Sequence, residues 1–325
     1  MQRRIPLPIV AGPTASGKTA LAVCLAQRFG GEVVSADSMQ IYSSLCIGTA
    51  RPREEELHGI PHHLLGFQPL DKPYSVARYV EDAHAVIAGI AERGKLPILC
   101  GGTGLYIQSL AENLVFAEEP EDTSCREELR RRIQQEGGAA LLEELRRVDP
   151  QTAGRLHEND HGRIIRALEV YHTTGRTMAQ QQAYSRRRPS PYNPWLLLLD
   201  CRNRQVLYDR IDRRAEEMLE KGLPEEAARV MKLPGSATAL QAIGYKELAP
   251  YLRGECTLEE AAERLKRGTR RYAKRQLSWF HRMSKTMPGT VLYIDEYADA
   301  QELEQDACLR MEAALQAMND RKGGQ

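Results

Sequence analysis

The sequence predicts an α/β protein, built on a parallel sheet that is flanked by helices and interrupted by a mostly helical insertion. Three observations support this prediction. The N-terminal third alternates short apolar runs with helical patterns, the middle of the chain is charged and poor in strand signals, and another apolar run follows a proline-rich stretch. Strands that alternate with helices in this way form parallel sheets with helices on both faces.

The elements of the sheet are identified from apolar runs and their spacing. In the first third, strands are expected at 5–10, 32–36 and 96–100, and helices at 19–29 and 76–93. The run WLLLLD is typical of a buried parallel strand and returns the chain to the sheet. The remaining expected elements are that strand at 195–200, helices at 204–221, 223–231 and 258–283, and a last strand at 291–295.

The middle of the chain is expected to form a separate helical part. Residues 121–147 and 161–172 are charged and helical in pattern. The proline-rich RRRPSPYNP at 186–194 ends this part, because proline cannot continue a helix. We therefore expect a P-loop catalytic core made of residues 1–116 and 194–325, and an insertion domain made of residues 117–193.

The composition argues against several classes of protein. No run of about 18 apolar residues occurs, so no membrane-spanning helix is expected. The first residues lack the apolar region and cleavage site of a secretory signal, which favours a cytoplasmic protein. The seven cysteines are widely spaced without a CxxC pair, which argues against a disulfide framework and a zinc site. A monomer is the default expectation.

The segment GPTASGKT gives the strongest functional signal. It fits the P-loop pattern G-x-x-x-x-G-K-[ST] and stands between an apolar strand and a helix, where this motif binds phosphates. The glycines let the backbone surround a phosphate, Lys18 adds a full charge, and Thr19 can ligate Mg²⁺. A substrate that carries a diphosphate or triphosphate is expected. The predicted phosphate-binding residues are Gly12, Pro13, Thr14, Ala15, Ser16, Gly17, Lys18 and Thr19.

Two acids at the ends of predicted strands could act beside this loop. Asp37 follows the P-loop by about 20 residues, where a doubly wound sheet brings the next strand end into the same crevice. A carboxylate beside a phosphate donor suits a general base, and Ser38 and Gln40 could recognise the acceptor. Asp200 could hold a metal ion, although capping of the following turn is the simpler interpretation. A turn or cap also stays open as the role of Asp37.

A basic face is predicted near the C-terminus, although the net charge of the chain is only +1. Between residues 264 and 285 there are nine Lys or Arg residues and no acid. Arg267, Arg271, Lys274 and Arg275 recur at helical steps, with aromatic residues between them. Such a face suits an RNA backbone, and the aromatic rings could stack on bases. A solvated helix face is the alternative.

Two weaker patterns complete the list of candidates. Arg210 and Arg214 lie one helical turn apart and could clamp a diphosphate together. His58, His62 and His63 could suggest a metal site, but Pro61 breaks the helix that would align them. We expect these histidines in a loop near the active crevice, without zinc.

Six motifs in order resemble the tRNA dimethylallyltransferases, the isopentenyl transferases of anticodon loops. The resemblance extends over residues 8 to about 283. It implies transfer of a dimethylallyl group from dimethylallyl diphosphate to N6 of the adenosine on the 3′ side of the anticodon. The motifs are GPTASGKT, SADSMQIY (35–42), GGTGLY (101–106), RIIRALEVY (163–171), AIGYKE (242–247) and RRYAKRQLSWF (270–280).

The resemblance also implies roles for individual residues. The loop from Thr14 to Thr19 would hold the donor diphosphate rather than ATP, which makes the terms nucleotide-binding and ATP-binding nominal, and Thr19 would ligate Mg²⁺. Asp37 matches the general base, Thr103 matches a polar residue near the reacting centre, and Arg210 and Arg214 match a helix that clamps the diphosphate. The helical insertion matches a domain that grips the anticodon stem-loop.

The tRNA-contacting stretches of the family can be placed on this chain by position. Ala242, Ile243 and Lys246 depart from the commoner valine and arginine but keep size and charge. The implied tRNA-binding residues are Asp37, Ser38, Met39, Gln40, Thr103, Cys125, Gly162, Arg163, Ile164, Ile165, Arg166, Gln241, Ala242, Ile243, Gly244, Tyr245 and Lys246, together with Arg271, Lys274 and Arg275 of the basic face.

Three alternatives stay open from the sequence. A small-molecule kinase would share the P-loop but has no use for a basic aromatic helix. An isopentenyltransferase acting on free AMP or ADP would need neither that helix nor the insertion. An RNA-binding module with a vestigial P-loop is disfavoured, because Lys18, Thr19 and Asp37 are all present.

Overall fold

The computed structural model describes residues 4–116 and 124–320, and the chain divides into two compact units. The first unit comprises Met1–Ala111 and Ser190–Gln325, and the second comprises Glu112–Pro189. The residue at which we expected the insertion to begin, 117, lies outside the described residues, as does the start of the helix expected at 121–147.

The first unit contains a six-stranded sheet in the order β3-β2-β4-β1-β5-β6, and each neighbouring pair is parallel. In register, Val10 lies between Cys100 and Leu197. The prediction of an α/β fold with a parallel sheet is confirmed. The strands are β1 (Ile5–Ala11), β2 (Gly31–Ser35), β3 (His62–His63), β4 (Leu96–Gly101), β5 (Tyr192–Asp200) and β6 (Gly289–Tyr293).

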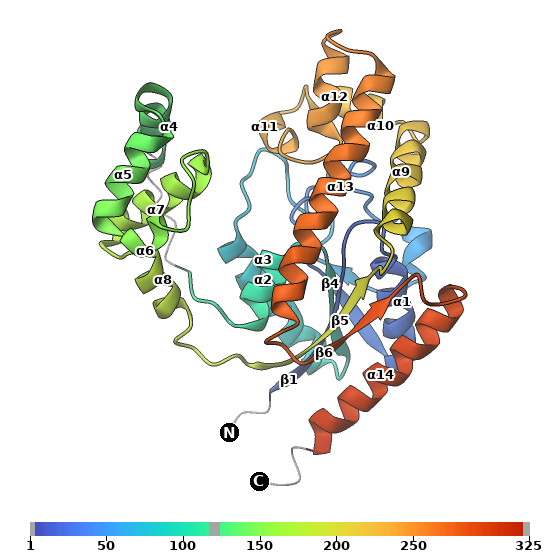
Figure 1. Ribbon diagram of the computed structural model, residues 1–325. Helices are drawn as coiled ribbons and strands as arrows, with labels where there is room; N and C mark the ends of the chain where they lie inside the picture. The colour runs from blue at the N-terminus through green and yellow to red at the C-terminus, as the bar shows by residue number, and fades with distance from the viewer. Residues whose placement is uncertain (1–3, 117–123, 321–325) are drawn as a thin grey trace. The chain divides into compact units, whose positions relative to one another are not determined.

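Helices cover both faces of this sheet. Crossovers between parallel strands are right-handed, so those that run in opposite directions along the sheet place their helices on opposite faces. Helices α1 (Lys18–Phe29) and α14 (Ala300–Asp320) pack side by side on one face, and α2 (Val76–Glu92) and α3 (Gly104–Ala111) lie on the other (Figure 1). On that second face the buried ring of Tyr79 stacks on Tyr106, with centroids 4.1 Å apart. The two-sided cover leaves the carboxyl ends of the strands as the open edge of the sheet.

Helix α13 (Leu258–Met283) is the longest helix of the first unit and joins two hydrophobic clusters (Figure 1). Thr257 begins it with a capping box, in which its side chain accepts the N–H of Glu260. Leu277, in its second half, packs with the sheet, whereas Leu265 packs around Ile41 and Tyr245. The neighbouring helices are η1 (Glu54–Leu57), α9 (Arg204–Glu220), α10 (Leu223–Val230), α11 (Ser236–Ala239) and α12 (Tyr245–Leu252).

The second unit is helical and has its own core, which includes Leu129, Leu141 and Leu168. Within the segment 121–147, expected to be helical, the described residues form two helices, because the chain bends at Gly137, whose φ of +83° favours glycine. The described helices of this unit are α4 (Ser124–Glu136), α5 (Gly138–Val148), α6 (Pro150–Ala153), α7 (His161–Thr174) and α8 (Met178–Ser185).

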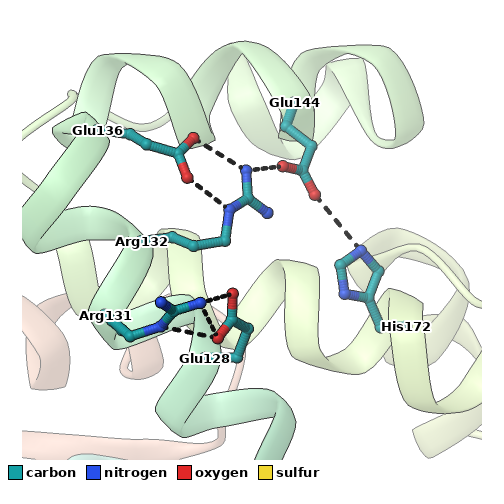
Figure 2. Close-up of polar contacts among 6 residues, drawn as sticks. All are labelled: Glu128, Arg131, Arg132, Glu136, Glu144 and His172. Atoms are coloured by element: carbon teal, nitrogen blue, oxygen red, sulfur yellow. Dashed lines mark hydrogen bonds and ion pairs between the residues drawn. The ribbon is translucent and has the colours of Figure 1, made fainter.

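Ion pairs connect the helices of the second unit. Arg132 of α4 bonds both Glu136 and Glu144, and Glu144 also faces His172 of α7 at 3.5 Å (Figure 2). The hydrogen bonds from Arg132 lower the pKa of Glu136. Arg132 therefore links α4 to α5, and Glu144 links α5 to α7.

Several elements differ from the expectation. Strand β5 begins at Tyr192, because Pro194 lies in register with Leu7 and the proline-rich stretch already forms part of the sheet. The last strand lies two residues earlier than expected, at Gly289–Tyr293. Helices α3, α12 and α14 and the short strand β3 were not predicted. Within the described part of the chain, no helix is long and apolar enough to span a membrane.

Candidate active site

The P-loop forms the turn between β1 and α1. Ala15 and Gly17 have φ of +63° and +87°, which bends the backbone into a loop before Lys18 begins the helix. A Cβ atom at Gly12 would lie 2.9 Å from Ser16 Oγ and 3.0 Å from Leu199 O, so glycine is required for this close approach. The Nζ atom of Lys18 donates to Pro13 O at 3.4 Å.

Two hollows meet beside this loop, within the first unit. The first has a volume of about 290 Å³, and the second, of about 660 Å³, lies toward residues 46–58. Lys18 and Arg214 line both. The remaining residues of the first hollow, called the reaction cavity below, are Thr14, Asp37, Ser38, Met39, Gln40, Gly48, Thr49, Ile211, Ala215, Met218, Gln241, Ala242, Ile243, Lys246, Leu265, Thr269, Tyr272, Arg275 and Gln276.

Lys18 and Arg214 make this junction strongly cationic. Burial, and then the charge of Arg214, lower the pKa of Lys18, and burial also lowers the pKa of Arg214. Within the described residues, the Arg214 guanidinium makes no hydrogen bond or ion pair. Two half-buried cations that form no ion pair within the described residues provide a site for an anion.

Arg210 contributes differently from Arg214. Its side chain is exposed and does not line either hollow. Its Nη2 atom lies 3.6 Å from the point where a Cβ of Gly17 would stand, which places it at the outer side of the P-loop. The two arginines therefore do not face one cavity together, because only Arg214 turns inward.

Asp37 follows β2 and lines the reaction cavity with one free carboxylate oxygen. Its Oδ1 atom accepts the N–H groups of Met39 at 2.9 Å and Gln40 at 3.2 Å. No hydrogen bond to its Oδ2 atom occurs within the described residues. The turn role and the role of a base are therefore compatible, since one oxygen holds the turn while the other is available.

Thr103 binds the segment that follows Asp37. Its Oγ1 atom accepts the N–H of Ser38 at 2.9 Å and donates to Ser38 Oγ at 3.3 Å. The glycines around it permit close contacts: a Cβ at Gly101 would lie 2.2 Å from Ala36 O, and one at Gly104 would lie 2.4 Å from the ring of Trp279. The GGTG sequence thus presses Thr103 against the Asp37 turn.

The predicted segment 241–246 divides between the cavity and the core. Gln241, Ala242, Ile243 and Lys246 line the reaction cavity. Tyr245 is fully buried instead, and its hydroxyl donates to Glu226 at 2.7 Å. Its side chain supports the fold and does not reach a ligand.

The sequence analysis missed two buried residues that shape this site. The Glu226 carboxylate accepts the N–H groups of Cys46, Ile47 and Gly48 and so fixes the loop that lines both hollows. The Gln276 amide bonds the P-loop and the GGTG segment. A weak signal exists for Gln276 alone: it lies four residues after Tyr272, on the helix face opposite the exposed cations.

The basic face of α13 is exposed as the spacing predicted. Arg267, Arg271 and Lys274 are exposed, and within the described residues they form no ion pair. Arg275 lies over the Tyr272 ring at 5.6 Å and reaches the reaction cavity. Other cations of this stretch are neutralised, for example Arg270 by Asp212 at 2.6 Å. The unpaired set forms a continuous surface that ends at the cavity.

Comparison with known proteins gives this arrangement a family. The family model described as IPP transferase matches residues 40–283. The chain belongs to the IPP transferase family. The resemblance predicted from the sequence is confirmed, and so is the prediction of an alkyl-transferring enzyme.

Relatives of this IPP transferase cover nearly the whole chain. It is 45% identical to a tRNA dimethylallyltransferase of Caldanaerobacter subterraneus, over 93% of this chain and 96% of the relative. A full-length tRNA isopentenylpyrophosphate transferase of Bacillus halodurans matches with a TM-score of 0.71 and 38% identity, over 98% and 99% of the two chains. A eukaryotic dimethylallyltransferase acting on tRNA matches with a TM-score of 0.77 and 29% identity, over 94% and 77%.

Some of the residues for which the resemblance implied a contact with tRNA lie in the second unit of this IPP transferase. Gly162 and Arg163 are exposed at the start of α7. Ile164 and Ile165 are buried in the core of the unit, so their side chains cannot reach a ligand. Arg166 bonds Glu169, and Cys125 Sγ lies 3.9 Å from His172 Nδ1.

The other candidates of this IPP transferase have structural roles. Asp200 is almost fully buried, and its carboxylate binds Arg204 at 2.5 Å and His281 at 2.7 Å. It therefore stabilises the end of β5 and does not line either hollow. The expectation of a loop for the histidines was wrong for two of them: His62 and His63 form β3, and His63 bonds Glu32 at 2.7 Å.

Proposed function

We propose that this chain transfers the dimethylallyl group of dimethylallyl diphosphate to N6 of the adenosine on the 3′ side of the anticodon in tRNA. The observation that carries the proposal is that one cavity joins two unpaired cations to a carboxylate with a free oxygen. Lys18 and Arg214 suit a diphosphate, and Asp37 suits an amine that must lose a proton. The names of the relatives, all prenyl transferases of tRNA, support the same reaction.

The chemistry follows from these groups. N6 of the adenine forms a bond to C1 of the allylic group as the bond from C1 to the diphosphate oxygen breaks. The leaving diphosphate takes the electron pair, and Lys18 and Arg214, which form no ion pair within the described residues, stabilise its charge. The amine proton passes to Oδ2 of Asp37, while Oδ1 keeps its bonds to Met39 and Gln40.

The residues near the P-loop fit Mg²⁺. Thr19 and Asp37 line one small hollow next to Lys18, which provides a hydroxyl and a carboxylate. Mg²⁺ is commonly held by one or two such oxygens together with substrate phosphates and waters. Thr19 would hold the ion, which supplies positive charge to the diphosphate when bound. Within the described residues, no group of three or more His, Cys, Asp or Glu side chains could hold a metal.

The exposed cations of α13 support RNA as the acceptor. Arg271 and Lys274 carry charge that no described acid neutralises, and Arg275 continues this surface to the cavity that holds Asp37. A phosphodiester backbone can supply the missing anions. A free nucleotide needs no such surface, which favours tRNA over AMP or ADP.

The test uses the purified chain, Mg²⁺, labelled dimethylallyl diphosphate and an unmodified tRNA transcript with adenosine 3′ to the anticodon. We expect label in the RNA and N6-isopentenyladenosine after digestion. A transcript with guanosine at that position is the matched control and should stay unlabelled. Label transferred to AMP but not to tRNA, or hydrolysis of ATP in place of prenyl transfer, would contradict the proposal.

A further inference from the structure

A buried amide bridges the two loops that carry the proposed chemistry. The side chain of Gln276, on α13, is 5% exposed. Its Oε1 atom accepts the N–H of Thr14 at 2.9 Å, and its Nε2 atom donates to Gly102 O at 2.9 Å. Thr14 belongs to the phosphate loop, and Gly102 directly precedes Thr103. Both ends of the amide are therefore used, one on each loop.

The bridge continues through Thr103 to the proposed base. The hydroxyl of Thr103 bonds the N–H and the Oγ atom of Ser38, which follows Asp37 in the chain. Tyr272, one turn before Gln276, has its hydroxyl within hydrogen-bonding reach of Thr103 and Gln276. Hydrogen bonds on both sides of the peptide link between Gly102 and Thr103 thus connect the phosphate loop to the turn that holds Asp37.

Gln276 is packed closely against Gly102 on one side and against the sheet on another. A Cβ atom at Gly102 would lie 2.3 Å from Gln276 Nε2. The GGTG segment therefore lies so close to the amide that no side chain fits between them. Behind the amide, Ala273 and Leu277 are buried against the sheet. Neither loop can shift relative to the other without breaking a hydrogen bond to Gln276.

We propose that Gln276 is a positioning residue, which sets the spacing between the phosphate loop and the Asp37 turn and thereby aligns donor and acceptor. The inference rests on the proposed prenyl transfer. A displacement at an allylic carbon requires the amine, C1 and the leaving oxygen in line. A misplacement of about 1 Å in such a reaction costs roughly 10²-fold in rate.

Two variants test this role, because they alter the two hydrogen bonds differently. Gln276→Met keeps the volume and removes both bonds. Gln276→Glu has one donor and one acceptor when its carboxyl is protonated, as the amide has, but two acceptors when it is ionised. The ionised form opposes the carbonyl of Gly102. Burial raises the pKa of the introduced carboxyl, and the cations Lys18 and Arg275 of the same cavity lower it. The fraction of each form therefore depends on pH.

The measurement is the single-turnover rate of labelled dimethylallyl transfer to tRNA, from about pH 5.5 to about pH 8.5. For Gln276→Met we expect a rate about 10²-fold below the unaltered chain at every pH, with the Kd of the diphosphate and of tRNA changed by only a few fold. For Gln276→Glu the ratio to the unaltered chain should rise by about tenfold as the pH falls. Use of a ratio removes any pH dependence that the two proteins share.

Ser278→Ala is the matched control, since Ser278 is exposed on the same helix and its hydroxyl donates to Lys274 O of that helix. It should keep the rate of the unaltered chain. Gln276→Met at the rate of the unaltered chain would overturn the inference while the proposed function stands. Absence of transfer by the unaltered chain would overturn the proposed function and this inference with it.

Discussion

The Oδ1 atom of Asp37 accepts the N–H of Met39 at 2.9 Å. This bond, with a second one from Gln40, holds the carboxylate in a turn at the end of β2 and leaves Oδ2 to the reaction cavity. An amide oxygen can accept the same bonds, so asparagine can keep the turn without the charge. The turn therefore provides a substitution that separates the shape of the site from its chemistry.

Lys18→Ala should abolish turnover and weaken binding of dimethylallyl diphosphate, because Lys18 is a half-buried point charge at the junction of the two hollows. The affinity for tRNA should change by only a few fold. Isothermal titration with the diphosphate, and separately with tRNA, measures both effects. The same Kd for the diphosphate in the variant and the unaltered chain would contradict the phosphate site.

Arg214→Ala should weaken binding of the diphosphate more than Arg210→Ala, although the sequence pattern assigns both residues to one clamp. Arg214 lines both hollows, whereas Arg210 is exposed outside them. We expect affinity to fall roughly 10-fold or more for Arg214→Ala, as a charge-assisted bond is worth about 1.5–3 kcal/mol. Arg213→Ala, exposed on the same helix, is the control. Equal effects at 210 and 214 would show that both reach the phosphates.

The exposed cations of α13 should contribute to the salt dependence of tRNA binding. Removing one phosphate-binding cation, at Arg271, Lys274 or Arg275, should flatten the slope of log affinity against log salt by roughly 0.7 to 0.9. Fluorescence titrations at several salt concentrations measure the slope of the triple alanine variant. The control removes three paired cations, Arg202, Arg253 and Arg310, which bond Glu296, Glu255 and Asp306. If both triple variants keep the slope of the unaltered chain, the face is only solvated.

The sheet and the first part of the site could be predicted because their signals are local. Apolar runs bounded by glycine or proline identified β1, β2 and β4, and the P-loop pattern is contained in eight residues. The bounds of α13 were also predicted, since Thr257 and Glu260 form a recognisable start. Helix α3 escaped prediction because its eight residues, GLYIQSLA, are too few to show a helical period.

The buried polar residues of the site could not be predicted, because their partners are distant in the chain. Gln276 bonds Thr14 across 262 positions, and Glu226 bonds Gly48 across 178. Within a sequence, both read as ordinary polar residues of a helix. Tyr245 shows the opposite case: its motif suggested a contact with a ligand, but the fold turns its side chain into the core.

The second unit should lose stability in acid through Glu169. Burial raises the pKa of this carboxyl, but hydrogen bonds from Arg126 and Arg166 outweigh it and hold the pKa below the usual value. Because the pKa is lower in the folded chain, the contribution to stability is complete above about pH 4.3, the unfolded value, and is lost as the pH falls through the folded value. Thermal unfolding of Glu169→Gln should show a lower melting temperature at neutral pH and a weaker dependence on acid.

The acid dependence needs a comparison with an exposed carboxyl. Glu143→Gln removes an exposed partner of Arg146 in the same unit, and its effect should be within about 0.5 kcal/mol at any pH. A Glu169→Gln variant with the melting temperature and pH dependence of the Glu143→Gln variant would contradict a stabilising role of the buried carboxylate.

The rate of dimethylallyl transfer in a single turnover, with the unaltered chain and with Asp37→Asn, tests the central claim most directly. The amine of adenine is a weak nucleophile, and removal of its proton as the new bond forms relieves the charge that would develop on N6. A general base contributes about 10²–10⁴ in rate. We predict that Asp37→Asn transfers the group more slowly by that factor, while its Kd for tRNA stays within a few fold. Transfer at the unaltered rate, or a decrease explained entirely by weaker tRNA binding, would contradict the assignment of Asp37 as the base in this cavity.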